Sequence, residues 1–154
     1  MEASRETICS LADEVLRRLS LPRVGLLWEV DPPPGGVSLR LPVSVVHYVW
    51  DEASARSGIR PVYLLSALED LRSEASTLDA LAVVGVGPDL ALDLLWGMPA
   101  TRKGQLVAWM LDEGKPVVME ASRLRGLYGW RGRVKGVFLD ALRTLERMGV
   151  VLVL

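Results

Sequence analysis

Apolar runs alternate with amphipathic stretches along this chain. Five runs are apolar at nearly every position and predict buried strands at residues 24–30, 59–65, 78–86, 116–120 and 150–154. Strands that are continuously apolar, and that alternate with helices, are typical of a parallel sheet covered on both faces. The pattern therefore predicts an α/β fold with a single doubly wound, mainly parallel sheet of about five strands. This is a Rossmann-like or flavodoxin-like three-layer sandwich.

Helices are predicted between these strands at residues 67–73, 90–96, 101–112 and 134–148. Residues 42–57 fit two assignments. Pro42 suits the first turn of a helix that would carry Val46 and Val49 on one face, and we expect a helix there. The same run is rich in β-branched and aromatic residues, which is the composition of a strand.

The chain begins with a separate amphipathic segment. Apolar residues recur at helical spacing at Ile8, Leu11, Ala12, Val15, Leu16 and Leu19. Ser4 can cap the start of this helix, and Pro22 ends it. We therefore expect an N-terminal helix in residues 1–21, followed by one α/β domain in residues 22–154.

Composition narrows the classes of protein that this chain can belong to. Its 154 residues suit one domain, and half of them are hydrophobic. No apolar run reaches the roughly 18 residues of a membrane span, and the N-terminus lacks the pattern of a signal peptide. A single cysteine, Cys9, excludes an internal disulfide and a multi-cysteine zinc site. We expect a cytoplasmic protein with no membrane partner and no metal.

A formal net charge of −1 argues against the whole molecule being a nucleic-acid binder. Locally, however, residues 123–135 contain five basic residues and no acid. This basic loop has three interpretations. It is a solvated loop, a phosphate site built from arginine and backbone N–H groups, or a nucleic-acid surface on which Tyr128 and Trp130 stack.

Ligands of doubly wound sheets bind beyond the carboxyl ends of the strands. Four stretches are expected to meet there: Asp31–Gly36, Ser66, Gly85–Asp89 and Glu120–Gly126. The glycines would let a backbone approach a flat ring or a phosphate. An ordinary strand-to-helix turn with Asp89 as its cap explains Gly85–Asp89 equally well. His47, the single histidine, is the sole candidate for a catalytic base, with a structural role as the alternative.

One stretch carries a resemblance to a known family. It reads "LDALAVVGVGPDLALDLLWGMPAT", then a helix, then "EGKPVVME". Its order of elements is a strand, a turn, a broken helix and a strand that begins with "KPV". In this order it resembles the FMN-dependent flavoproteins that include the phosphopantothenoylcysteine decarboxylases and flavin prenyltransferases. Asp89 falls where that family places an asparagine, and Gly87 where it places a serine.

The resemblance implies a homo-oligomeric FMN-binding protein with a redox role, or with decarboxylase-like activity. The cofactor-binding residues that it implies are Gly35, Gly36, Ser38, Gly85, Gly87, Asp89, Thr101 and Ser122. Gly35, Gly36 and Ser38, or alternatively the loop at Arg123–Arg125, would meet the phosphate. Two alternatives stay open. One is a structural or interaction protein of the same fold without flavin, and the other is a nucleotide or nucleic-acid binder that uses residues 123–135.

The N-terminal segment "ICSLADEVLRRLSL" carries a second resemblance. It is similar to the short helices at the ends of bacterial microcompartment proteins, which bind shell or cargo partners. This implies a location within a microcompartment and a shell or cargo partner for the first helix. The alternative is a helix that folds onto its own sheet or onto a neighbouring subunit.

Overall fold

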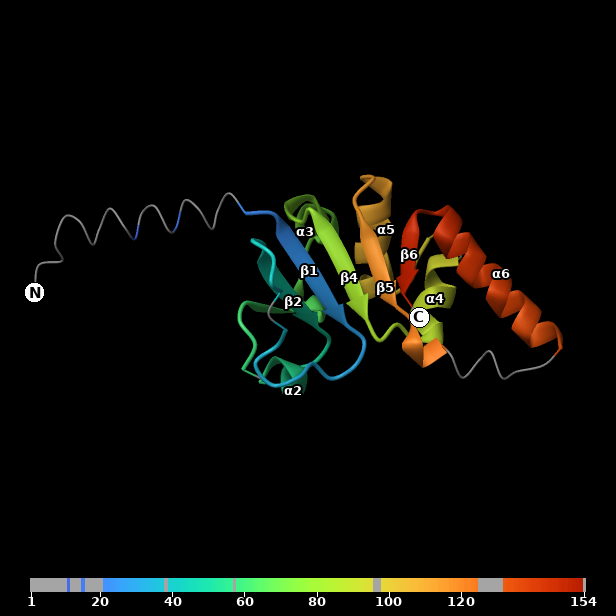
Figure 1. Cartoon of the computed structure of the whole chain (residues 1–154), viewed down its shortest axis with the longest axis horizontal. Coiled ribbons are helices and arrows are strands. Elements are labelled where there is room, and N and C mark those ends of the chain that lie inside the picture. Colours follow the sequence, from blue (N-terminus) through green and yellow to red (C-terminus); the bar gives the residue numbers. More distant parts are fainter. Residues whose placement is uncertain are drawn as a thin grey trace, which may run out of the picture.

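The computed structural model describes residues 11, 15, 21–37, 39–56, 58–95, 98–124 and 132–153. Its centre is a six-stranded sheet with the order β3-β2-β1-β4-β5-β6, in which every neighbouring pair is parallel (Figure 1). The strands are β1 (Arg23–Trp28), β2 (Ser44–Val49), β3 (Val62–Leu64), β4 (Ala80–Val84), β5 (Val117–Glu120) and β6 (Val150–Val153). The predicted α/β fold is confirmed, with six strands instead of about five. This strand order is that of the Rossmann fold, whose chain reverses direction across the sheet between β1 and β4.

The additional strand is β2, in the stretch for which we expected a helix. That expectation was wrong, and the strand alternative is correct. β2 pairs with β1 and with β3, and His47, Tyr48 and Val49 are buried in it. A helix would bury one stripe of this segment, whereas Val46–Val49 are buried at four consecutive positions, so both faces of the strand are covered there. The helix α2 (Glu52–Ala55) begins only after Asp51, which caps it through a bond from the Ser54 amide.

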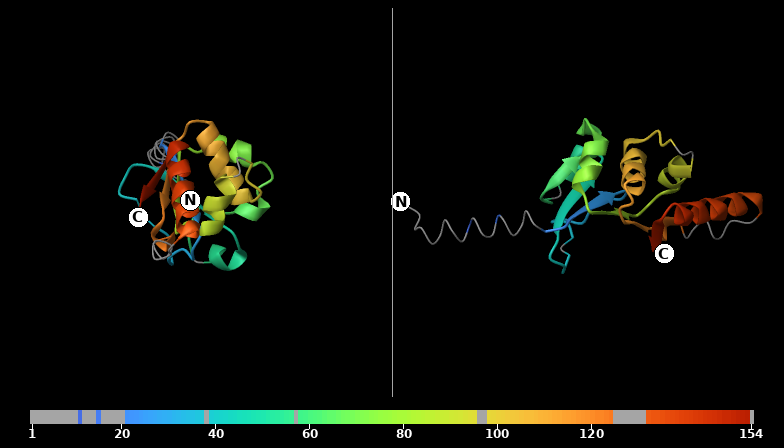
Figure 2. Two further views of the ribbon diagram at one scale, coloured as in Figure 1. Left: turned by 90° about the vertical axis from the view of Figure 1, so that its right-hand side faces the viewer. Right: turned by 90° about the horizontal axis from the view of Figure 1, so that it is seen from above.

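The larger helices pack together on one face of the sheet. They are α3 (Leu71–Thr77), α4 (Pro88–Leu95), α5 (Arg102–Asp112) and α6 (Arg133–Arg147). Figure 2 shows α3, α4 and α5 on the same side of the strands. The helix predicted at residues 67–73 in fact begins at Leu71, because Asp70 caps it there by accepting bonds from the amides of Arg72 and Ser73. Residues 65–67 form a short 3-10 turn, η1 (Leu65–Ala67).

The main hydrophobic core lies between the sheet and these helices. It includes the fully buried Leu81, Val83, Leu106, Met110 and Met119. A smaller cluster of Leu26, Trp28, Val49 and Ile59 lies on the other face of the sheet, and α2 adds Ala55 to it. The two faces of the sheet are thus covered to very different extents in the described part of the chain.

The predicted N-terminal helix lies outside the described residues, except for Leu11 and Val15. Both are helical and more than half exposed. No helix among the described residues is long and apolar enough to cross a membrane.

Candidate functional site

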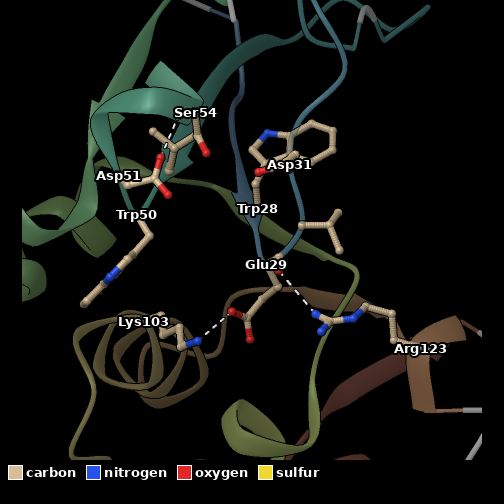
Figure 3. A pocket seen from close by; sticks show the side chains of 10 residues that line it. Trp28, Glu29, Asp31, Trp50, Asp51, Ser54, Lys103 and Arg123 are labelled. Carbon is tan, nitrogen blue, oxygen red and sulfur yellow. Dashed lines mark hydrogen bonds and ion pairs between the residues drawn. The ribbon is translucent and has the colours of Figure 1, made fainter. Parts of the chain in front are cut away.

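An open cleft of about 540 Å³ lies at the carboxyl ends of the strands. Cavities of about 300–1,000 Å³ are typical of small-molecule sites. Its walls come from the ends of β1 and β2, from the start of α5 and from the turn after β5 (Figure 3). The lining residues are Trp28, Glu29, Val30, Asp31, Val49, Trp50, Asp51, Ser54, Lys103 and Arg123. The cleft therefore lies where a sheet of this strand order binds its ligands.

Glu29 is the charged group that follows β1, and it lies between the two basic residues of the cleft (Figure 3). Its side chain is only 8% exposed. The Lys103 ammonium donates to Glu29 Oε2 over 2.6 Å. The other oxygen, Oε1, is buried and has no hydrogen-bond partner among the described residues. An unpartnered buried acceptor is costly, so this oxygen is a place where a ligand donor would be stabilised.

Lys103 connects Glu29 with Asp89. Its ammonium lies 3.2 Å from Asp89 Oδ2 in addition to the contact with Glu29. Burial works to lower the pKa of Lys103, but the hydrogen bonds and charges of Glu29 and Asp89 outweigh it and raise that pKa. Lys103 is therefore cationic at neutral pH and neutralises the carboxylate that β1 brings to the cleft.

Arg123 is oriented by backbone carbonyls. Its Nη1 donates to Gly85 O over 2.8 Å and to Glu29 O over 3.2 Å. The Gly85 carbonyl follows β4 and the Glu29 carbonyl follows β1. The guanidinium therefore lies at the boundary between β1 and β4, where the strand order reverses. Within the described ranges Arg123 makes no ion pair, and its remaining N–H groups have no protein partner. A fixed guanidinium with free donors is suited to binding a carboxylate or a phosphate.

The opposite wall of the cleft comes from β2 and α2. The Trp50 side chain is 51% exposed and offers a flat ring. Asp51 accepts a bond of 2.7 Å from the Ser54 amide, and hydrogen bonding by Ser54 lowers the pKa of Asp51. Figure 3 shows Trp50 and Asp51 on one side of the cleft and Arg123 on the other. The cleft thus combines carboxylates, two basic groups and an aromatic surface.

Three of the predicted cofactor residues, Gly85, Gly87 and Asp89, lie close together where β4 leads into α4. Gly85 has a φ of +70°, and a Cβ there would lie 2.6 Å from Val30 Cγ1. A Cβ at Gly87 would lie 2.6 Å from Asp89 Oδ1. Asp89 lies in the first turn of α4 instead of capping it. The chain itself fills the space beside both glycines, and this turn adjoins the cleft through Val30, Arg123 and Lys103.

Three of the other predicted residues, Gly36, Thr101 and Ser122, make local contacts. A Cβ at Gly36 would collide with Ile59 and approach His47. Thr101 caps α5 by accepting from the Gly104 amide, and its hydroxyl donates to Asp93 over 2.6 Å. The Ser122 amide donates to Glu120. No Cβ contact would arise at Gly35, and Ser38 lies outside the described residues. Of the described residues, Gly35, Gly36, Thr101 and Ser122 do not line the cleft.

His47 is 3% exposed and is not among the residues that line the cleft. Its Nδ1 accepts a hydrogen bond of 3.0 Å from the indole N–H of Trp28, and the two rings stack. Burial lowers the pKa of His47, so the ring is neutral at pH 7. These contacts describe a structural histidine that holds β1 and β2 together.

Sequence reasoning missed Glu29, Asp51 and Lys103. A signal existed for Glu29, because it is the one charged residue within the apolar run of residues 24–30. Asp51 was hidden by the helix assigned to residues 42–57, and Lys103 is an ordinary surface residue by its helical position. Arg123 was named, as part of the alternative phosphate site. In the described part of the chain, no group of three or more His, Cys, Asp or Glu residues could hold a metal ion.

The fold and cleft define a Rossmann-type α/β protein with a polar cleft at its switch point. Comparison with protein-family models, with curated proteins and with solved structures finds no match to this chain.

Proposed function

We propose that the cleft binds flavin mononucleotide and that the protein has a redox function. One observation carries the proposal. A buried acceptor without a partner, Glu29 Oε1, and a cation without an ion pair, Arg123, line the same cleft in the described structure. A ligand that satisfies both must carry an anionic group and a hydrogen-bond donor.

FMN has these groups in the required combination. Arg123 would hold the phosphate, and Glu29 would accept a hydrogen bond from a hydroxyl of the sugar-alcohol chain. Trp50 would pack against the flat ring, because an exposed indole favours stacked aromatic partners. When bound, the flavin supplies the electron-accepting chemistry. The resemblance of residues 78–121 to FMN-dependent flavoproteins supports the same assignment.

The strand order alone would suit a dinucleotide equally well, but the turn after β1 argues against a dinucleotide. Dinucleotide-binding folds hold the pyrophosphate on a glycine-rich turn and the N-terminus of the helix that follows β1. Here β1 leads into Pro32, Pro33 and Pro34, and the described residues between β1 and β2 contain no helix. Prolines lack the N–H groups that such a site requires. A single phosphate at Arg123 is therefore favoured over a pyrophosphate at β1.

Matched variants test this assignment. We expect Arg123→Gln to weaken FMN binding about 10- to 100-fold, since a hydrogen bond to a charged group contributes about 1.5–3 kcal/mol. Riboflavin, which lacks the phosphate, should bind both forms equally. Arg143→Gln is the control, because Arg143 is an exposed arginine on α6, remote from the cleft. Equal losses for FMN and riboflavin, or no loss for either, would exclude Arg123 as the phosphate ligand.

Glu29→Gln tests the hydroxyl contact separately. We expect this variant to weaken FMN and riboflavin by a similar factor, because both carry the sugar-alcohol chain. Unchanged binding of both ligands would show that Glu29 does not contact them.

The homo-oligomer and the microcompartment partner of the first helix stay predictions. Sedimentation of the purified full chain, and capture of shell proteins by it, would test them.

A further inference from the structure

β5 and β6 are apolar on both faces, but the described structure covers only one face of these strands. Val117, Met119 and Val150 face the helices and are at most 3% exposed. Their immediate neighbours point the other way, and Val118, Val151 and Val153 are 36%, 56% and 50% exposed. The contrast is between adjacent residues of the same strands, so it reflects the missing cover and not the strand sequence.

The exposed valines belong to a continuous apolar surface. The strand register places the half-buried Ala82 beside Val118 and Val151 across β4, β5 and β6, and the buried Leu26 of β1 lies on the other side of Ala82. In Figure 1 the helices α3 and α5 lie behind these strands, and no described helix lies in front of β4 and β5. Parallel sheets are found almost only with both faces covered, because both faces of their strands are apolar. We call this surface, formed by Ala82, Val84, Val118, Val151 and Val153, the open face.

A segment of matching character precedes β1. Residues 4–19 carry a stripe of six apolar side chains at helical spacing. Two members of that stripe, Leu11 and Val15, are helical and are 60% and 54% exposed. The described structure therefore has an apolar sheet face without a covering helix, and the two described members of the apolar stripe are themselves exposed.

We propose that residues 4–19 pack on the open face of the same chain, antiparallel to β1. Only residues 20–22 join this segment to β1, and the Pro22 carbonyl is fixed by a bond from the Ser44 amide. Short connections of about 2–6 residues make consecutive elements of α/β folds pack against each other. A helix of 16 residues is about 24 Å long, and a six-residue strand is about 20 Å long. The helix thus spans the height of the sheet.

Cross-linking distinguishes this arrangement from a second copy or another partner on the open face. Val15→Cys and Val118→Cys are introduced together in a Cys9→Ser background, and isotope-labelled and unlabelled chains are mixed before a short bismaleimide is added. We expect one internal cross-link between positions 15 and 118. The pair Val15→Cys with Asp112→Cys, on the exposed side of α5, is the control and should not cross-link. Cross-linked peptides that join labelled to unlabelled chains would overturn the proposal, as would equal yields for the two pairs.

A second measurement needs no cross-linker. Hydrogen exchange of residues 4–19 is compared between the natural chain, Val151→Asp and Val137→Asp. Both valines are more than half exposed, so neither change disturbs the core, but Val137 lies on α6, away from the open face. We expect Val151→Asp to accelerate exchange of residues 4–19 about tenfold, because burial of a valine is lost. Val137→Asp should leave it unchanged. Equal exchange in all three proteins would contradict the proposal.

Discussion

Removal of the Lys103 ammonium is expected to destabilise the protein through Glu29. The two groups are 2.6 Å apart, and their side chains are 18% and 8% exposed. In Lys103→Met, Glu29 Oε2 loses its hydrogen bond from the ammonium, and Oε1 already has no partner among the described residues. The negative charge of Glu29 nevertheless stays largely buried. Removal of one member of a buried pair costs about 3–5 kcal/mol. Because Glu29 lines an open cleft that water can enter, we expect the lower limit, about 3 kcal/mol.

The loss is measured by urea and thermal unfolding at pH 7, followed by the emission of the five tryptophans. About 3 kcal/mol corresponds to a Tm lowered by about 6–12 °C in a chain of this length. The double variant Lys103→Met/Glu29→Gln removes the buried charge as well, and should recover at least half of the loss. Arg143→Met is the control, since its partner Asp140 is 76% exposed and exposed pairs contribute about 0–1 kcal/mol.

The pH dependence supplies an independent check. The pKa of Lys103 is raised above its ordinary value of 10.5 in the folded protein. A raised lysine pKa stabilises the folded state fully below that ordinary value, and the contribution is lost as the pH rises through the folded-state pKa. The difference between the natural chain and Lys103→Met should therefore be constant near pH 7–9 and shrink above 10.5. A loss below about 0.5 kcal/mol at pH 7, or a double variant no more stable than Lys103→Met, would refute the reasoning.

Three further substitutions test the fold. Burial works to raise the pKa of Asp93, but hydrogen bonds, chiefly from Thr101, outweigh it and lower that pKa. Asp93→Ala should therefore cost about 1–2 kcal/mol in urea unfolding at pH 7, and the difference should vanish as the pH falls below 3.8. Gly25→Ala places a Cβ 2.9 Å from Tyr48 Cε2 in the sheet core, and should cost about 1–3 kcal/mol in the same assay. Gly136→Ala meets no atom within 4 Å in α6, and should raise the stability by about 0.5–1 kcal/mol. A stabilising Gly25→Ala or a destabilising Gly136→Ala would contradict the packing described for these positions.

The sequence allowed the α/β class to be predicted because most strands are apolar at nearly every position and alternate with helical segments. Residues 78–86 and 116–120 show this pattern, and they became β4 and β5. The prediction for residues 42–57 was wrong because the local composition fits a helix and a strand alike. Only pairing with both β1 and β3 decides for the strand, and pairing is a long-range property.

The site was predicted less completely than the fold. Its position at the carboxyl ends of the strands follows from the topology of parallel sheets, and the glycines of the turn after β4 lie beside the cleft as that rule suggests. The charged groups that line the cleft could not be assigned in the same way. Glu29 and Lys103 are 74 positions apart, and nothing local in either segment indicates that they pair. Asp51 required the correct assignment of β2.

Equilibrium titration of the purified chain with FMN and with riboflavin tests the central claim most directly. Flavin fluorescence reports binding, and the two ligands differ only in the phosphate that Arg123 is proposed to hold. We predict saturable binding of one FMN per chain, with an affinity at least about tenfold higher than that for riboflavin. Absence of saturable FMN binding up to about 1 mM would contradict the claim that this cleft is a flavin site.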